Sequence, residues 1–441
     1  MSVRIGPYRV LGRLGQGGMA TVLTVEHEAL GKVMALKLLR PSELNEALVG
    51  LDVLNERFRD EARLMASLEH ENIASVWDLG HDRGTPYMVM EYCSVNLGLI
   101  IGEVRRVEEA TRPMEPGLAM DFVRQALAGL DRMHRAGMVH RDVKPHNLML
   151  TGTGRVKLID LGLALVRGRE WIPHRAMRVG SAYYAAPEQE EDPNGVNPSA
   201  DLYAVGVVLY RLLSGHLPPE PGRVDEQAGW DAKWTAFFKR AMNPIPGRRF
   251  ASAKEMTGAL DDLFKRWLKE HEAVCRLDEA EIKPIRVIRP RSDPIRTGVR
   301  NLPNFIGLDD LLRATNSGSS VFQSTEHGML DARTGLEWSL HGPGYPMNMA
   351  EAAEVLAGLP KDGGRAWRLP TVDEMATILQ TPVFPRTSCV PDWLPHAAPW
   401  VWTSDRRSHR HHWVADVRNG AVFPLEPMAR ITILPVRRIK R

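Results

Sequence analysis

Cysteine is scarce in this sequence, and long apolar runs are absent. The three cysteines, Cys93, Cys275 and Cys389, lie far apart and have no paired spacing. This excludes a zinc ribbon and argues against a disulfide framework, so a reducing cytoplasm is the expected environment. No N-terminal stretch resembles a signal peptide. The best apolar run, 203–213, contains Arg211 and falls short of the ~18 residues that cross a bilayer, so we expect a cytoplasmic protein without a membrane span.

An excess of charge of one sign is missing as well. The net charge is +3, with 25% charged and 44% hydrophobic residues. This composition is ordinary for a globular protein, and the charge is too small to predict nucleic-acid binding. A length of 441 residues is enough for two or three domains.

One short loop, 140–147, holds the residues best suited to chemistry. Asp142 can accept a proton from a hydroxyl, Lys144 can balance charge on a phosphate, and Asn147 can ligate a divalent metal through its amide oxygen. Asp160, followed by leucine and glycine, offers a second oxygen ligand. Such a set suits phosphoryl transfer, which depends mainly on positioning and charge neutralisation. Each residue alone is more commonly a solvated loop charge, but their joint order and spacing argue against coincidence.

The order and spacing of these residues resemble the catalytic motifs of bacterial Hanks-type serine/threonine protein kinases. The resemblance implies that Asp142 is the base for the acceptor hydroxyl and that Lys144 contacts the γ-phosphate. It also implies that Asn147 and Asp160 hold Mg²⁺, and that ATP and Mg²⁺ are the cofactors.

A glycine-rich turn between two strand-like runs comes near the N-terminus. Glycine lets backbone N–H groups approach phosphates without a Cβ in the way, although an ordinary hairpin has the same pattern. By the resemblance this stretch covers ATP, and Ala20 stands where the family usually has a third glycine. The residues are Leu14, Gly15, Gln16, Gly17, Gly18, Met19, Ala20, Thr21 and Val22.

A strand and a helix follow the turn. The run 33–39 predicts a strand with Ala35 and Lys37 on one face, against which adenine and phosphates could lie. The run 57–68 predicts an amphipathic helix with Glu61 beside its apolar stripe. A buried carboxylate needs a partner, and the Lys37–Glu61 pair matches the ion pair of kinases. The alternatives are a snorkelling surface lysine and a rim glutamate in water.

The resemblance extends to the hinge and to residues that hold the catalytic lobe together. The run 87–93 is similar to the last small-lobe strand and the hinge, which makes Met90 the gatekeeper. The backbone of Glu91 and Cys93 would hydrogen-bond adenine. A helix is predicted over 121–136.

Three further residues have counterparts in the family. Asp201 resembles the anchor of the catalytic loop. Arg249 resembles the arginine that pairs with Glu188, although the adjacent Arg248 could serve instead.

The segment before Glu188 has few hydroxyl groups. Arg141 precedes the base, and in related kinases this arginine usually binds a phosphate on the activation loop. Yet residues 163–180 contain no Ser, Thr or Tyr and only one carboxylate, Glu170. We hypothesise that no phosphothreonine switches this kinase on there; Glu170, an acidic partner or an acidic substrate would organise the loop instead. The segment carries Arg167, Arg169, Arg175 and Arg178.

After about residue 320 the sequence becomes rich in tryptophan. Asn348 with Glu351, and Thr371 with Glu374, predict two capped helix starts. Four motifs resemble a bacterial domain with a C-type-lectin-like fold, which is found at the C-termini of collagen-like and other surface or signalling proteins. The resemblance covers roughly the last quarter of the chain, and most of the tryptophans are expected in its core. The motifs are Thr334-Gly335-Leu336-Glu337-Trp338, Trp367-Arg368-Leu369-Pro370-Thr371, Trp402-Thr403-Ser404 and Leu434-Pro435-Val436-Arg437.

Loops near the last strands often bind ligands in that fold, so 404–419 is the expected surface for an unknown ligand or protein. His409, His411 and His412 invite a metal interpretation. Histidines this close together without Cys or carboxylate partners more often form an exposed basic loop.

The fold class we expect is α+β: a bilobal protein kinase fold followed by a small α+β C-type-lectin-like domain. The predicted function is ATP-dependent phosphorylation of Ser/Thr hydroxyls on protein substrates, acidic ones included, with the C-terminal domain controlling input or recruitment. The alternative is a catalytically weak kinase-fold scaffold whose main activity is ligand binding by the C-terminal domain. The intact Lys37, Glu61, Asp142, Asn147 and Asp160 argue against it.

Breaks in composition divide the chain. Prolines and arginines before residue 301 favour an extended solvated linker, with a basic strip docked on an acidic surface as the alternative. Residues 316–320 predict a flexible joint. The predicted division is a kinase domain 1–270 with a small lobe 1–92 and a large lobe 93–270, a basic Pro/Arg-rich linker 271–320 and a C-terminal domain 321–441.

Overall fold

A computed structural model gives the fold of the chain. It describes residues 3–17, 19–103, 106–161, 164–166, 183–220, 223–224, 230–272, 290–298, 308–315, 322–340, 342–360, 366–379, 390–391, 393–394 and 399–439. Gly18, the segment 167–182 and the joint predicted at 316–320 lie outside these ranges.

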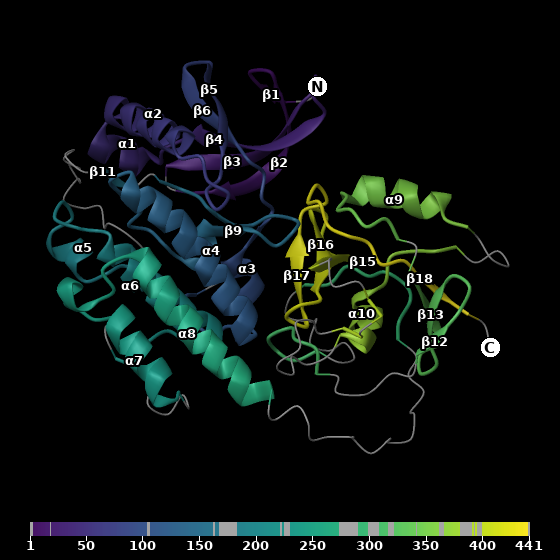
Figure 1. Cartoon of the computed structure of the whole chain (residues 1–441). Coiled ribbons are helices and arrows are strands. Elements are labelled where there is room, and N and C mark those ends of the chain that lie inside the picture. The colour runs from purple at the N-terminus through teal and green to yellow at the C-terminus, as the bar shows by residue number, and fades with distance from the viewer. Residues whose placement is uncertain are drawn as a thin grey trace.

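The small lobe is a six-stranded antiparallel sheet with the order β1-β2-β3-β4-β6-β5, covered by two helices (Figure 1). The expected helix over 57–68 begins earlier, because α2 continues back to Leu51. Its buried face includes Phe58, Ala62 and Met65, at the spacing of one helical face. The elements are β1 (Arg4–Ile5), β2 (Tyr8–Gln16), β3 (Ala20–His27), β4 (Lys32–Leu39), α1 (Glu43–Val49), α2 (Leu51–Ser67), β5 (Val76–Asp82) and β6 (Thr85–Met90).

The large lobe is mainly helical. Its centre is α6, in which every residue from Ser199 to Leu212 is buried, and this explains the apolar run at 203–213. The helix expected over 121–136 starts at Pro116, because Glu115 caps it. The elements are β7 (Val95–Asn96), α3 (Leu97–Ile101), α4 (Pro116–Arg135), β8 (Met138–Val139), η1 (Pro145–Asn147), β9 (Leu148–Leu150), β10 (Val156–Leu158), β11 (Leu165–Val166), α5 (Glu188–Glu191), α6 (Ser199–Ser214), α7 (Ala232–Ala241), η3 (Pro246–Arg248) and α8 (Ala253–Glu272).

In its described ranges the C-terminal domain combines two small antiparallel sheets with two helices. One sheet has the order β12-β13-β14-β18 and the other β15-β16-β17. Both predicted capping boxes are present, at Asn348 with Glu351 and at Thr371 with Glu374. The elements are β12 (Phe322–Ser324), β13 (Gly328–Asp331), β14 (Leu336–Ser339), α9 (Met349–Gly358), α10 (Val372–Ile378), β15 (Trp400–Ser408), β16 (His411–Asp416), β17 (Ala421–Leu425) and β18 (Val436–Arg438).

The segment 290–298 corrects the prediction of an extended solvated linker. The Arg291 guanidinium makes a bidentate contact with Asp405, at 3.0 and 2.7 Å. Thr297 accepts a hydrogen bond from the indole of Trp413 and bonds to the backbone of Arg406. Arg291 therefore matches the alternative interpretation, a basic strip on an acidic surface, and this part of the predicted linker is built into the C-terminal domain.

The kinase lobes and the C-terminal domain share one apolar core. The cluster that fills the large lobe continues into Trp400, Trp402 and Phe423. A second cluster surrounds Trp338 and Trp413, so most of the tryptophans are buried as expected. Figure 1 shows β16 and β17 on the side of the domain that faces α3 and β9. Within the described ranges no helix is long and apolar enough to cross a bilayer.

Candidate active site

Lys37 joins two acidic side chains from different elements. Its amine, on β4, lies 2.6 Å from Glu61 Oε1 on α2 and 2.9 Å from Asp160 Oδ1, just after β10. Burial opposes the charge on Lys37, but Asp160 and Glu61 outweigh it and raise its pKa. The charge of Lys37 in turn holds the pKa of Asp160 well below its usual range. Asp160 keeps a side chain that is 45% exposed, so its carboxylate can accept a further cation.

Burial acts differently on the second carboxylate. Glu61 is only 5% exposed, and desolvation raises its pKa to about 7 despite the opposing charge of Lys37. Asp160 is therefore the more firmly ionised partner and the better suited to a metal.

The catalytic-loop side chains gather around Asp142. Lys144 Nζ lies 2.8 Å from Asp142 Oδ2, and Asn147 Nδ2 donates to the same oxygen at 2.9 Å. A second bond from Asn147 Nδ2 to the backbone carbonyl of Asp142 fixes the amide. Because its nitrogen is engaged in this way, Asn147 presents its amide oxygen as the atom that could ligate a metal.

Asp201, on α6, fixes the backbone of the catalytic loop. Its buried carboxylate accepts hydrogen bonds from the backbone N–H of His140 at 2.9 Å and of Arg141 at 2.8 Å. The His140 ring reaches the carbonyl of Ile159 at 3.1 Å, which connects the loop to the residue before Asp160. Arg141 and Asp160 both have positive φ, 67° and 66°, a backbone conformation that costs energy for residues other than glycine. The fold thus holds both segments in fixed, strained positions.

Arg249, and not Arg248, pairs with Glu188. Its guanidinium makes two hydrogen bonds to the carboxylate of Glu188, at 2.6 and 2.7 Å.

Arg141, the residue before Asp142, is buried. Its side chain is 1% exposed and donates a hydrogen bond to the carbonyl of Pro193 at 2.9 Å. Burial lowers its pKa to about 10.

The predicted nucleotide face is assembled by the small-lobe sheet and the hinge. Of the stretch 14–22, all but Gly18 is described, and it forms the end of β2 and the start of β3. Ala35 on β4 lies opposite Met90 on β6 in the strand register. The backbone N–H of Glu91 donates a hydrogen bond to a small-lobe carbonyl. The carbonyl of Glu91 is therefore the backbone group of this residue that remains for the predicted bond to adenine.

Cys93, on the hinge, is buried and makes no disulfide. Burial raises the pKa of its thiol to about 12, so it stays protonated and unreactive at neutral pH. This agrees with a purely structural side chain at this position.

Two polar clusters near the cleft have no local pattern that sequence reasoning could have detected. Lys157 lies 2.9 Å from Glu91 and ties the hinge to the large lobe. Glu103, 4% exposed, accepts from Tyr184 at 2.6 Å and lies 3.3 Å from Arg211. This explains how α6 carries an arginine within an apolar run.

The segment 404–419 differs from the loop surface expected of it. It forms most of β15 and β16, and many of its residues are buried, so only the hairpin tip around Arg407 and Arg410 is open. The three histidines separate: His409 contacts Arg296, His411 bonds to Ser408, and His412 is buried. No group of three metal-ligating side chains occurs in the part of the chain that the structure describes.

Comparison with known proteins agrees with this geometry. The family description "Protein kinase domain" matches residues 8–273, and "Lcl C-terminal domain" matches residues 327–437. The chain therefore belongs to the protein kinase family, and its residues 327–437 are similar to the second family.

Bacterial kinases are among the proteins that it resembles. It is 35% identical over 301 residues to the serine/threonine-protein kinase PrkC of Bacillus subtilis, covering 64% of this chain and 45% of that one. It is 36% identical over 211 residues to PknL of Mycobacterium tuberculosis, covering 48% and 50%. The chain spans about half the length of these curated relatives. The solved kinase domain of M. tuberculosis PknI is 25% identical, with a TM-score of 0.44, and is matched over 59% of this chain and 97% of its own.

Proposed function

We propose that the protein is an ATP-dependent serine/threonine protein kinase. The observation that carries the proposal is the Lys37–Glu61–Asp160 cluster, with the Asp142 loop connected to it through the His140–Ile159 contact. Both relatives named above are serine/threonine-protein kinases, which supports the same activity.

Each side chain has a role in this proposal. Asp142 orients the acceptor hydroxyl and takes its proton, and Lys144, 2.8 Å away, carries the positive charge for the transferred phosphoryl group. Lys37, fixed by Glu61, holds the phosphates of ATP. The donor set of Asn147 and Asp160 is made of oxygens and fits Mg²⁺, which when bound neutralises charge on the phosphates.

A phosphoryl-transfer assay on the purified full chain tests this function. With ATP, Mg²⁺ and a generic protein acceptor, we expect the Asp142→Asn variant to turn over roughly 10²- to 10⁴-fold more slowly, the usual contribution of a general base. ATP binding should survive, since Asp142 does not hold the nucleotide. A comparable rate in wild type and variant would exclude Asp142 as the base, and no transfer by the wild type would favour a scaffold. Phosphoproteomics of a strain with this substitution would then identify the substrates.

The switch in this kinase would not be an activation-loop phosphothreonine. The segment 163–180 lacks hydroxyl side chains, and Arg141, which would bind such a phosphate, is buried against Pro193. The arginine-rich segment would then be organised by Glu170 or by an acidic partner or substrate. Phosphosite mapping of active protein should find no stoichiometric, activity-dependent phosphate between 163 and 188; finding one would overturn the idea.

The C-terminal domain would have a C-type-lectin-like fold and bind a ligand or protein partner. The exposed tip of the β15–β16 hairpin, with Arg407 and Arg410, is the part of 404–419 that remains open for it. Comparison of close relatives tests whether this surface is diversified: hypervariability confined to 404–423 would support a diversified recognition domain, and uniform sequence there would count against one.

A further inference from the structure

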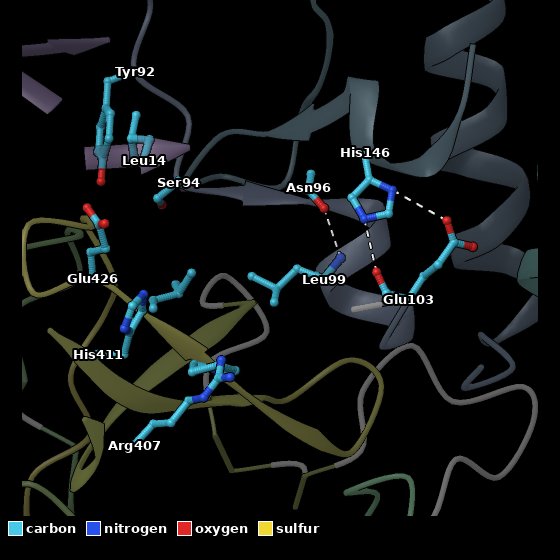
Figure 2. Close-up of a pocket in the computed structure, with 12 residues that line it drawn as sticks. Leu14, Tyr92, Ser94, Asn96, Leu99, Glu103, His146, Arg407, His411 and Glu426 are labelled. Carbon is cyan, nitrogen blue, oxygen red and sulfur yellow. Dashed lines mark hydrogen bonds and ion pairs between the residues drawn. The ribbon is translucent and has the colours of Figure 1, made fainter. Parts of the chain in front are cut away.

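A cavity of about 370 Å³ lies where the kinase cleft meets the C-terminal domain (Figure 2). One wall comes from the kinase domain: the hairpin β2–β3, here called the glycine-rich hairpin, together with the hinge and the catalytic loop. The other comes from the hairpin β15–β16, the end of β17 and the residue that follows it. Residues that line it include Leu14, Tyr92 and His146 on the kinase side, and Arg407, His411 and Glu426 on the other.

Glu426 joins the C-terminal domain to the small lobe. Its carboxylate accepts a hydrogen bond from the hydroxyl of Thr24, a fully buried residue of β3, at 3.4 Å. On the neighbouring strand, a Cβ added at Gly12 would lie 3.6 Å from Glu426 Oε2. Figure 2 shows the hydroxyl of Tyr92, on the hinge, pointing toward the same carboxylate. Burial, and then the charge of Glu426, raise the pKa of Tyr92. One acidic side chain thus bonds to the hairpin β2–β3 and faces the hinge.

Arg112, a residue of the large lobe, joins that lobe to the C-terminal domain. This attachment is much stronger than the Thr24–Glu426 bond. The Arg112 guanidinium is buried and donates to two carbonyls of α3, Leu99 and Ile100, each at 2.8 Å. It also donates to Val422 of β17 at 3.1 Å and to Leu311 at 3.2 Å. A charged donor with four acceptors away from water is a firm attachment, whereas the Thr24–Glu426 bond is single and long.

We infer that the C-terminal domain braces the two kinase lobes, and that Glu426 is a positioning residue that holds the glycine-rich hairpin closed over the nucleotide. The domain moves with the large lobe because of Arg112. When the small lobe lifts to release nucleotide, the contact that breaks is therefore Thr24–Glu426. The inference rests on the proposed nucleotide site, since Leu14 belongs to both that site and the cavity.

The dissociation rate of a fluorescent ADP analogue with Mg²⁺, measured by stopped flow on the full chain, tests the brace. We expect Glu426→Ala to release the nucleotide about five-fold faster, the effect of losing one hydrogen bond. Thr24→Val, which removes the other partner without changing its shape, should have the same effect. The double variant should be no faster than either one.

Two further variants separate the contact from general damage. Glu426→Gln keeps an acceptor for Thr24 and should stay within about two-fold of the wild type. Glu354→Ala removes an exposed carboxylate on α9 and should change nothing. If Glu426→Ala does not fold, which its thermal melt will show, the Thr24→Val rate decides.

The outcomes distinguish a failure of the brace from a failure of the proposed kinase function. A wild-type chain that binds no nucleotide analogue would overturn the proposed kinase function. A wild type that binds it, with Thr24→Val and Glu426→Ala releasing it at the wild-type rate, would overturn the brace alone. Faster release from Glu354→Ala as well would also count against it.

Discussion

Three acidic side chains near the cleft differ in how strongly they hold their charge, and the difference comes from their neighbours. Asp160 is exposed enough to meet a metal and is kept ionised by Lys37. Glu61 is buried, and its pKa rises to about 7. Glu426 lies at the edge of the C-terminal domain, and burial raises its pKa as well. Charge at these positions is therefore set by burial and by ion pairing, which residue identity alone does not reveal.

Glu61 gives a prediction at this scale. Glu61→Gln leaves Lys37 paired with Asp160 alone, so the lysine should move toward Asp160 and away from the phosphates. We expect turnover to fall by roughly 10-fold or more, about 1.4 kcal/mol of transition-state stabilisation. Steady-state phosphoryl transfer at saturating ATP measures it. An exposed carboxylate on the same helix, changed by Asp52→Asn, is the matched control; equal effects of the two changes would contradict the prediction.

His412 gives a pH dependence. It is 6% exposed and packs edge-on against Trp402, and burial lowers its pKa to about 4. Between the unfolded value of about 6.5 and the folded value, the unfolded chain binds more protons, so stability falls as the pH is lowered through that window. The loss should reach as much as about 3 kcal/mol.

Thermal melts of wild type and His412→Leu from pH 7 to pH 4.5 check this expectation. The variant should lose part of the wild-type pH dependence, because it has no imidazole to protonate. His409→Leu, at an exposed imidazole on the same hairpin, should keep the dependence. Parallel pH curves for wild type and His412→Leu would contradict the assignment.

Among the elements, the two capped helices of the C-terminal domain differ in their surroundings. Thr371, at the start of α10, is fully buried and also donates to the carbonyl of Arg291 at 2.7 Å. Asn348, at the start of α9, is partly exposed, and its side chain accepts hydrogen bonds from the backbone N–H groups of Ala350 and Glu351. Loss of a cap costs about 0.5–2 kcal/mol. We expect Thr371→Ala to lower the free energy of unfolding by an amount at or above the upper end of this range. Asn348→Ala should lower it by an amount near the lower end.

Chemical denaturation of the two variants measures this difference in the free energy of unfolding. The larger loss for Thr371→Ala comes from the Arg291 carbonyl that is left without its donor. Equal losses would mean that the Arg291 contact adds nothing to the cap.

Local patterns predicted much of this architecture. The capping boxes, the β4 strand and the helix bearing Glu61 depend on spacing over a few residues, and all three are present. The contact of Lys37 with Asp160 has no local pattern in the sequence, because the two residues lie on separate elements. The segment 290–298 was mistaken for a solvated linker, since its partner Asp405 lies far along the chain.

At the scale of the whole molecule, contacts between the domains had no signal in the sequence. Arg112 and Val422 belong to different domains, and nothing near either residue indicates the other. Most of the tryptophans were expected in the core of the C-terminal domain, but Trp400 and Trp402, together with Phe423, join the core of the large lobe. Burial of such residues depends on how complete domains fit together, which short-range patterns do not encode.

The attachment at Arg112 leads to the last prediction. Arg112→Met keeps much of the side-chain volume but leaves four buried carbonyls without their donor, and should lower the free energy of unfolding by about 3 kcal/mol or more. Because the carbonyls belong to α3 on one side and to the C-terminal domain on the other, amide hydrogen exchange should rise in both α3 and β17.

Arg430→Gln is the matched control for this change. It removes an arginine of the same domain whose ion pair with Glu351 is exposed, and such pairs contribute less than about 1 kcal/mol. Its exchange should stay close to the wild type in α3. If Arg112→Met raised exchange in β17 while α3 remained protected, the guanidinium would stabilise only its own side of the boundary. The two domains would then be held together by the shared apolar core alone.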